Sequence, residues 1–216
     1  YGSYSSAIQD YVDFDLFCRV ANDPGAPALL DVVDPYRHIA KYTMPKYIVN
    51  ASGDQFFLPD SSRYYYQDLP NPNQTWLRYF PNKDHYMEGV IDDYNNLLGI
   101  LSWGANMMSG AGNVHPTWYV DGAGQILFYA NGSPSSVKLW QATNPNGRDF
   151  RLETVGPIYT STPLTDQGGG LYVGYCPPPP QGFTAYFVEA TYGTQVFTSR
   201  IVVTPDYDPY DGMGCW

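Results

Sequence analysis

Positively charged side chains are scarce in this sequence of 216 residues. It has 11 Lys and Arg against 21 Asp and Glu, which gives a net charge of -10 and a pI near 4.4. Nucleic-acid binding depends on clustered Lys and Arg that meet phosphates, so this composition excludes nucleic acid as a partner. No apolar run approaches the roughly 18 residues that a membrane span needs, and we expect no membrane span.

Histidine and cysteine are also scarce, with three of each. None of them stands at the spacing of metal ligands, so we expect neither a metal nor any other cofactor. The cysteines are Cys18, Cys176 and Cys215. Because their number is odd, at least one is free or pairs outside this segment, and the pairing stays open.

The sequence does not begin with Met, and it shows no signal peptide. We therefore expect a processed form or the later part of a longer polypeptide. Tyr, Asn, Gly and Pro are abundant and Lys is rare, a composition that favours a secreted, extracellular protein. Three triplets fit the glycosylation sequon, at Asn50, Asn73 and Asn131. Chance occurrence in an Asn-rich chain is the alternative explanation of these triplets.

Residues 1–112 carry mixed helix and strand signals. A short apolar run from Pro45 to Ala51 predicts a strand buried on both faces, as in a parallel sheet. A second run from Thr75 to Phe80 predicts the next strand, and a helix from about Arg63 to Asp68 is expected between them. This order of elements is typical of a crossover connection between parallel strands.

A longer helix is predicted from about Tyr86 to Met108, because apolar residues recur every three or four positions. A glycine-rich linker at 109–113 follows it. The recurring residues are Met87, Val90, Ile91, Tyr94, Leu97, Leu98 and Leu101.

Residues 113–205 have a different pattern, in which short alternating runs are separated by Gly and Pro turns. This pattern predicts an antiparallel β-sandwich of the immunoglobulin-like kind. Residues 206–216 show no period and are expected to form a surface tail. The predicted strands cover residues 118–120, 125–129, 136–142, 150–155, 171–175, 184–191 and 198–203.

Two residues stand where a catalytic pair is expected. Asp54 follows the first predicted parallel strand, and His85 follows the second. Loops after adjacent parallel strands meet at the carboxyl edge of the sheet, so we predict that these side chains meet there. A carboxylate holds an imidazole in the useful tautomer, and the imidazole then takes a proton from a hydroxyl nucleophile. A turn aspartate and a surface histidine are the structural alternative.

The nucleophile itself is not visible. No G-x-S-x-G motif, which forms the nucleophile elbow in α/β-hydrolases, occurs in the sequence. Ser3, Ser5 and Ser6 have no preceding strand, and Ser52 is too close to Asp54 to be its partner in a triad.

Three aromatic residues lie beside the predicted pair in the sequence. Phe56, Phe57 and Tyr86 are candidates for lining a substrate pocket. Packing is the structural alternative for such side chains.

Five segments, in this order along the chain, resemble the PhoPQ-activated pathogenicity-related proteins, a family that includes secreted autocrine proliferation repressors. The resemblance extends over about residues 7–205. The segments run from Asp34 to Arg37, Thr43 to Ser62, Leu77 to His85, Leu139 to Pro145 and Arg148 to Thr154.

This resemblance implies a fold of the α/β class. Residues 1–112 would be the C-terminal portion of an α/β-hydrolase domain, with a parallel sheet and flanking helices, and the β-sandwich would follow. Asp54 would be the acid and His85 the base of a serine hydrolase of peptidase or esterase type. Gln55 and Tyr86 depart from residues that are common in the family, and neither removes the pair.

The resemblance also implies partners. The nucleophilic serine would lie in the N-terminal remainder of the same protein, as a covalent or cleaved chain, and a peptide or ester would be the substrate. This segment alone would be inactive. The alternatives are a secreted signalling or binding protein on a hydrolase scaffold, and an extracellular structural protein.

Overall fold

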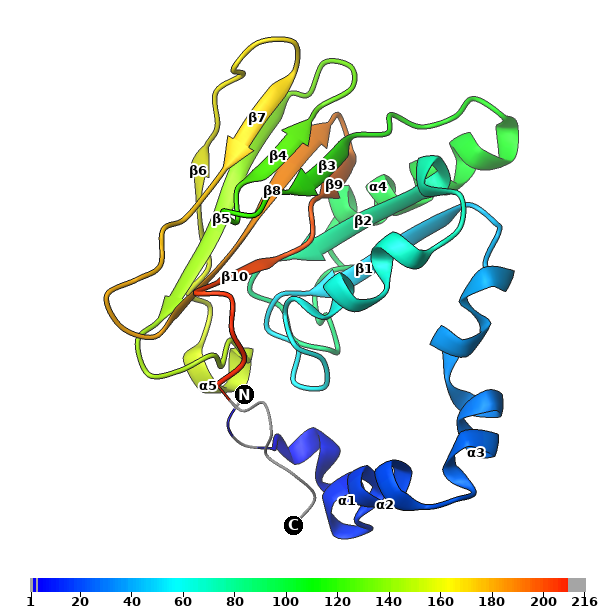
Figure 1. The fold of residues 1–216 in the computed structure, drawn as a ribbon. Coiled ribbons are helices and arrows are strands. Elements are labelled where there is room, and N and C mark those ends of the chain that lie inside the picture. Colours follow the sequence, from blue (N-terminus) through cyan, green and yellow to red (C-terminus); the bar gives the residue numbers. More distant parts are fainter. Residues whose placement is uncertain (1, 3, 210–216) are drawn as a thin grey trace.

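The computed structural model describes residue 2 and residues 4–209. The N-terminal segment forms short helices, the first of which Figure 1 shows as an arm away from the sheets. Residues with turn conformations keep these helices short, for example Asp15, whose φ is 53°. The helices are η1 (Ser6–Ile8), α1 (Gln9–Asp13), α2 (Leu16–Asn22), α3 (Ala26–Val33) and η2 (Pro35–Lys41).

The chain then enters two parallel strands, β1 (Lys46–Ala51) and β2 (Thr75–Phe80). Both strands were predicted from the sequence and are confirmed. β2 is buried along its whole length, whereas most of β1 is only partly buried. The single helix predicted from about Arg63 to Asp68 is confirmed only in part, because the chain there forms short 3-10 helices separated by a turn. They are η3 (Ser61–Tyr64) and η4 (Tyr66–Asp68), and η5 (Pro72–Gln74) follows them.

The expected extended parallel sheet of an α/β-hydrolase is also wrong. In the described residues, the parallel sheet has only β1 and β2, and the other two sheets are antiparallel. Parallel strands need a crossover connection of a dozen or more residues, usually helical. The segment before β1 forms short helices, and the strands after β2 are joined mostly by short turns, so no further parallel pair forms.

Helix α4 (Tyr94–Ser109) begins eight residues later than the predicted start at Tyr86. Its N-cap is Asp93, whose side chain accepts hydrogen bonds from the backbone N–H groups of Asn95 and Asn96. Before it, Met87 has a φ of 51°, which no helix accommodates. The apolar residues from Met87 to Ile91 thus have the spacing of a helix, although the segment that carries them forms turns.

Two antiparallel sheets follow. The three-stranded sheet has the order β3-β4-β7, and the five-stranded sheet has the order β10-β8-β5-β6, with β9 also paired to β8. The strands are β3 (Thr117–Val120), β4 (Ile126–Tyr129), β5 (Ser136–Asn144), β6 (Thr160–Pro163), β7 (Leu171–Gly174), β8 (Phe183–Tyr192), β9 (Gln195–Thr198) and β10 (Val202–Thr204).

The strand predicted at 150–155 is wrong, since this segment contains the short helix α5 (Leu152–Val155). Strand β6 was not predicted. Its sequence is polar and largely exposed, so it lacks the apolar alternation that indicates a strand.

The five-stranded sheet is the middle layer of the molecule. Successive residues of a strand point to opposite faces, and those of β8 divide between two hydrophobic clusters. Tyr186 and Val188 pack toward the three-stranded sheet, whereas Phe187 packs with Leu77 and Tyr79 of β2. Buried packing thus extends across residue 112, where the sequence suggested a division into units. That division stays a prediction.

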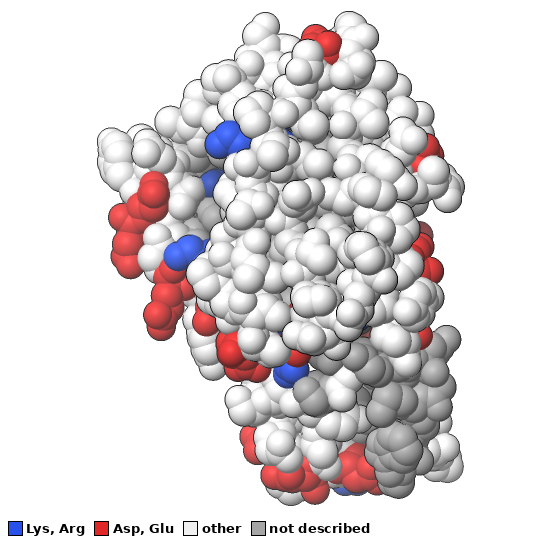
Figure 2. Space-filling view, turned by 90° about the vertical axis from the view of Figure 1, so that its left-hand side faces the viewer, with Lys and Arg blue, Asp and Glu red and all other residues white. Residues whose placement is uncertain are grey.

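Charged side chains are unevenly spread over the surface. Figure 2 shows a face almost free of Lys, Arg, Asp and Glu, with acidic residues gathered at its margins and lower end. Within the described part of the chain, no helix has the length and apolar character to cross a membrane.

Candidate functional site

The parallel register of β1 and β2 brings two loops to one edge of the sheet. Lys46 lies beside Thr75 at one end, and Ala51 lies beside Phe80 at the other. Asp54 therefore emerges three residues past the end of β1, next to the loop that follows β2 and carries His85. The predicted meeting of these loops is found.

Asp54 and His85 are joined by a hydrogen bond. Oδ2 of Asp54 lies 2.9 Å from Nδ1 of His85. The carboxylate is nearly buried, with 10% of its side chain exposed, while the imidazole is 39% exposed. Oδ1 of Asp54 accepts hydrogen bonds from the backbone N–H groups of Phe56 and Phe57, at 2.7 and 3.1 Å. These two donors fix the carboxylate, so its other oxygen orients the ring.

Gln55 positions the histidine from the other side. Its side-chain Oε1 accepts a hydrogen bond from the backbone N–H of His85 at 3.0 Å. The backbone carbonyl oxygen of Gln55 accepts a hydrogen bond from the hydroxyl of Ser5 at 2.8 Å. Sequence reasoning identified Gln55 only as a departure from the family pattern and did not find this role.

Gly53 fits a space that no larger residue can occupy. A Cβ there would lie 2.9 Å from the backbone nitrogen of Leu152 and 3.1 Å from the carbonyl oxygen of Lys83. The backbone of Gly53 uses the same neighbours, since its N–H donates to Lys83 and its carbonyl accepts from Leu152. The loop that carries Asp54 is therefore held between the His85 loop and α5.

Asn82 holds the second loop. Its φ of 57° lies in the left-handed region, which Asn tolerates better than most residues. Its side chain donates to the carbonyl of Tyr159 at 2.9 Å and accepts from the Tyr159 N–H at 2.8 Å. The only sequence signal for this role is the Pro-Asn turn after β2.

The three predicted pocket aromatics surround the imidazole. The ring centres of Phe56, Phe57 and Tyr86 lie 4.4, 5.9 and 6.1 Å from that of His85. Tyr86 is 68% exposed and Phe57 is 59% exposed. These rings restrict the rotation of His85 and leave part of its edge open to solvent.

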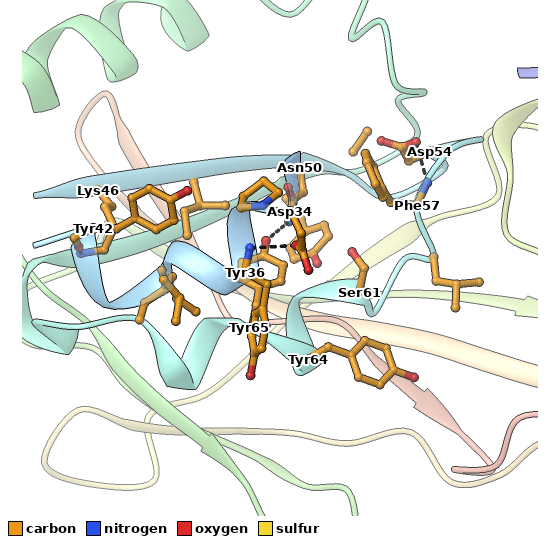
Figure 3. A pocket seen from close by; sticks show the side chains of 17 residues that line it. Asp34, Tyr36, Tyr42, Lys46, Asn50, Asp54, Phe57, Ser61, Tyr64 and Tyr65 are labelled. Carbon is orange, nitrogen blue, oxygen red and sulfur yellow. Dashed lines mark hydrogen bonds between the residues drawn. The ribbon is translucent and has the colours of Figure 1, made fainter. Parts of the chain in front are cut away.

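A cavity of about 900 Å³ begins beside this pair. In Figure 3, Asp54 and Phe57 stand at one end of it, and Lys46 and Tyr42 stand at the other. Asn50 lines the cavity between them. Of the three predicted pocket residues, Phe57 lines this cavity, whereas Phe56 and Tyr86 lie against the ring of His85 and are not among the residues that line it.

The other predicted residues lie apart from the pair. Asn73 and Asn131 are exposed, whereas Asn50 is half-buried in β1. Glycosylation at all three stays a prediction. Within the described residues, no group of three or more His, Cys, Asp or Glu side chains is arranged to hold a metal ion.

The cysteines differ in state. Cys18 is disulfide-bonded, while Cys176 is a free, buried thiol. Burial raises the pKa of the Cys176 thiol to about 11, so it is no nucleophile at neutral pH. Cys215 lies outside the described residues.

The sequence of this chain is similar to those of known proteins. It is 28% identical to autocrine proliferation repressor protein A of Dictyostelium discoideum over an alignment of 238 positions, gaps included. The alignment covers 97% of this chain and 48% of the relative. The chain thus spans about half the length of that protein. No solved structure matches it significantly. The model of the family described as PhoPQ-activated pathogenicity-related protein matches residues 1–151. The chain therefore belongs to this family.

Proposed function

We propose that this chain supplies the acid and the base of a serine hydrolase that acts on ester or peptide bonds. The observation that carries the proposal is the 2.9 Å contact between Asp54 Oδ2 and His85 Nδ1. With Nδ1 donating to the carboxylate, Nε2 keeps its lone pair. It can take the proton of an attacking hydroxyl and later give it to the leaving group, while Asp54 stabilises the imidazolium.

The nucleophile is proposed to come from outside these 216 residues. Among the described residues, no hydroxyl or thiol forms a hydrogen bond with the His85 imidazole. The chain matches only 48% of its relative, which leaves ample sequence for a further segment in a protein of that length. That segment, covalent or cleaved, would place a serine hydroxyl at Nε2 and provide oxyanion donors.

The test is made in the full-length polypeptide with a fluorophosphonate probe that labels activated serines. We expect His85→Ala to lower the labelling rate and the esterase kcat by about 10⁴-fold or more. His38→Ala is the matched control, because His38 lies in η2, outside the candidate pair, and its Nδ1 lies 3.4 Å from Nζ of Lys41. Equal labelling of the wild type and His85→Ala would refute the proposal.

Asp54→Asn tests the role of the carboxylate separately. The amide keeps an oxygen for the N–H groups of Phe56 and Phe57, so the turn is preserved. Its nitrogen can only donate to Nδ1, which moves the ring proton to Nε2 and blocks proton abstraction. We expect kcat to fall roughly 10⁴-fold with unchanged stability. Full activity of this variant would leave Asp54 as a turn residue.

We also propose secretion. Support comes from the disulfide at Cys18, because disulfides persist in oxidising compartments. The sequons at Asn73 and Asn131 lie on exposed residues, where a glycan has room. Secretion by the native host, with a mass shift on deglycosylation, is the expected result. Retention of the unmodified protein in the cell would contradict it.

A signalling role without catalysis is the second candidate. It is supported by the name of the relative, an autocrine proliferation repressor. Addition of purified full-length wild type and His85→Ala to cultures of the host organism separates the two functions. Equal effects of both proteins on cell number favour signalling without catalysis, whereas an effect of the wild type alone favours hydrolysis.

A further inference from the structure

We infer that the 900 Å³ cavity beside Asp54 is a binding site for an uncharged, apolar group, namely the acyl chain or apolar side chain of a substrate. That the ligand is part of a substrate rests on the proposed function, whereas the chemical class of the ligand is inferred from the cavity itself. The cavity lies within the range of about 300–1,000 Å³ that is usual for ligand pockets.

Three elements form the walls of the cavity. Ile48 and Asn50 project from one face of β1, since alternate residues of a strand share a face. Ile39 of η2 lies opposite, and Leu58 and Tyr65 come from the connection after β1. Most of the exposed wall is apolar, so an apolar ligand would gain roughly 25 cal/mol for each Å² it buries.

The charged groups at the cavity already have partners. Nζ of Lys46 donates to the carbonyl oxygens of Tyr42, Met44 and Pro70, each at 2.9 Å. These bonds use all three of its donors. An anionic ligand would have to displace one of these bonds.

Asp34, an acidic residue at this wall, also has a hydrogen-bond partner. Oδ1 of Asp34 accepts from the backbone N–H of Tyr36 at 2.9 Å, at the start of η2. The hydroxyl of Tyr36 is committed to Asp68 at 2.6 Å. Asp54, the other acidic residue at the cavity, is bonded to His85, and the remaining polar side chains at the wall, such as Asn50 and Ser61, are neutral. A neutral ligand therefore fits the cavity better than an ion.

The position of the cavity gives it a role. Asp54 and Phe57 stand at one end, and Phe57 also lies 5.9 Å from the ring of His85. In Figure 3 the cavity extends from these residues along β1 toward Lys46. An extended apolar group seated along β1 would thus end at Asp54 and Phe57. The bond to be cleaved would lie beyond that end, where the serine is proposed to meet Nε2 of His85.

Binding is tested without catalysis, by titration of the full-length protein with the uncharged fluorophore Nile red. Ile39→Trp and Leu58→Trp should each fill part of the cavity, and we expect each to raise the dissociation constant for Nile red at least tenfold. Leu101→Trp is the control, since Leu101 is 57% exposed on α4. Two filling variants are used so that misfolding of one, visible by circular dichroism, leaves the other informative.

The result that would overturn the inference is Nile red binding by both filling variants at wild-type affinity. His85→Ala should bind Nile red normally even though it does not hydrolyse esters. The two proposals therefore fail separately: loss of hydrolysis alone concerns the pair, and loss of cavity-dependent binding alone concerns the ligand class.

Two sources of the apolar group are distinguished by kinetics. A lipid-like acyl chain predicts that kcat/KM for 4-nitrophenyl octanoate exceeds that for the acetate by tenfold or more in the wild type. If the apolar group is a peptide side chain, kcat/KM should be tenfold or more higher for a substrate with leucine before the cleaved bond than for one with glycine there. In either case Ile39→Trp should abolish the preference. A preference for charged groups would refute the inference.

Discussion

At the residue scale, the pair of Asp149 and Arg151 fixes the segment that supports the candidate site. Nε and Nη2 of Arg151 lie 3.0 and 2.5 Å from Oδ1 and Oδ2 of Asp149. The next residue, Leu152, donates its N–H to the carbonyl of Gly53 at 3.0 Å. Burial alone would raise the pKa of Asp149, but hydrogen bonds from the Arg151 side chain and backbone outweigh it and lower the pKa.

This shift predicts how stability depends on pH. A carboxyl whose pKa is depressed in the folded state stabilises the protein above its unfolded pKa, near 4, and loses this contribution as the pH falls through the folded value. Asp149→Asn removes a charged hydrogen-bond partner of the buried Arg151, whose Nη1 keeps a longer contact of 3.7 Å to Glu153, and should cost about 3 kcal/mol at pH 7. Urea denaturation should show this difference from the wild type shrinking below pH 4.

Asp92→Asn is the control for this experiment, because Asp92 is exposed. It should leave the pH profile of stability unchanged. A difference between the wild type and Asp149→Asn that stays constant from pH 7 to pH 2.5 would contradict the assignment.

At the element scale, α4 offers two glycines in contrasting surroundings. A Cβ on Gly99 would lie 2.3 Å from the carbonyl oxygen of Thr194, in the turn between β8 and β9. A Cβ on Gly104 would meet nothing within 4 Å. Gly99 therefore allows the helix to pack closely against this turn, whereas Gly104 serves no packing purpose.

Alanine at the two positions separates packing from helix propensity. Both substitutions gain about 1 kcal/mol of intrinsic helix stability. Gly104→Ala should therefore stabilise the protein by about that amount, while overpacking should make Gly99→Ala destabilising by about 1–3 kcal/mol. Free energies of unfolding in urea provide the measurement. Equal stabilisation by both substitutions would show that α4 does not pack closely here.

Local signals predicted β1 and β2, because Pro45, Gly53 and Pro81 delimit their apolar runs. Asp54 and His85 were predictable for the same reason, since their position relative to strand ends is a property of sequence. The strand order around them was not, because neighbours in a sheet are chosen by tertiary packing. The cavity beside Asp54 escaped prediction as well, as its walls come from segments far apart in the sequence.

At the scale of the whole molecule, a buried ion pair joins the segment after β1 to the segment after β5. Asp60 precedes η3 in the connection after β1, and Arg148 follows β5. Nη2 of Arg148 lies 2.6 Å from Oδ2 of Asp60, and their side chains are 4% and 0% exposed. Arg63 reaches the same oxygen at 3.3 Å and also binds Asp206, so the start of the tail is attached to this group.

The pair is incompletely satisfied. Oδ1 of Asp60 and Nε of Arg148 are buried, and neither has a hydrogen-bond partner among the residues that the structure describes. Each charge therefore depends strongly on the other, because desolvation is compensated mainly by their mutual attraction. Loss of Asp60 would therefore leave Arg148 as an unpaired buried charge, whereas loss of Arg148 would leave Asp60 with the contact to Arg63.

A double-mutant cycle measures this coupling. Asp60→Asn leaves the buried Arg148 without its carboxylate and should cost about 3–5 kcal/mol. Arg148→Met leaves Asp60 with the longer contact to Arg63, at 3.3 Å, and should cost less than Asp60→Asn. The double variant should cost clearly less than the sum, because it removes both charges together. Arg37→Met is the control: its pair with Asp31 is 2.6 Å long but exposed, and such surface pairs contribute less than about 1 kcal/mol. Additive single costs would mean that hydrophobic packing alone joins β2 to the middle sheet, with Asp60 and Arg148 as independent buried charges.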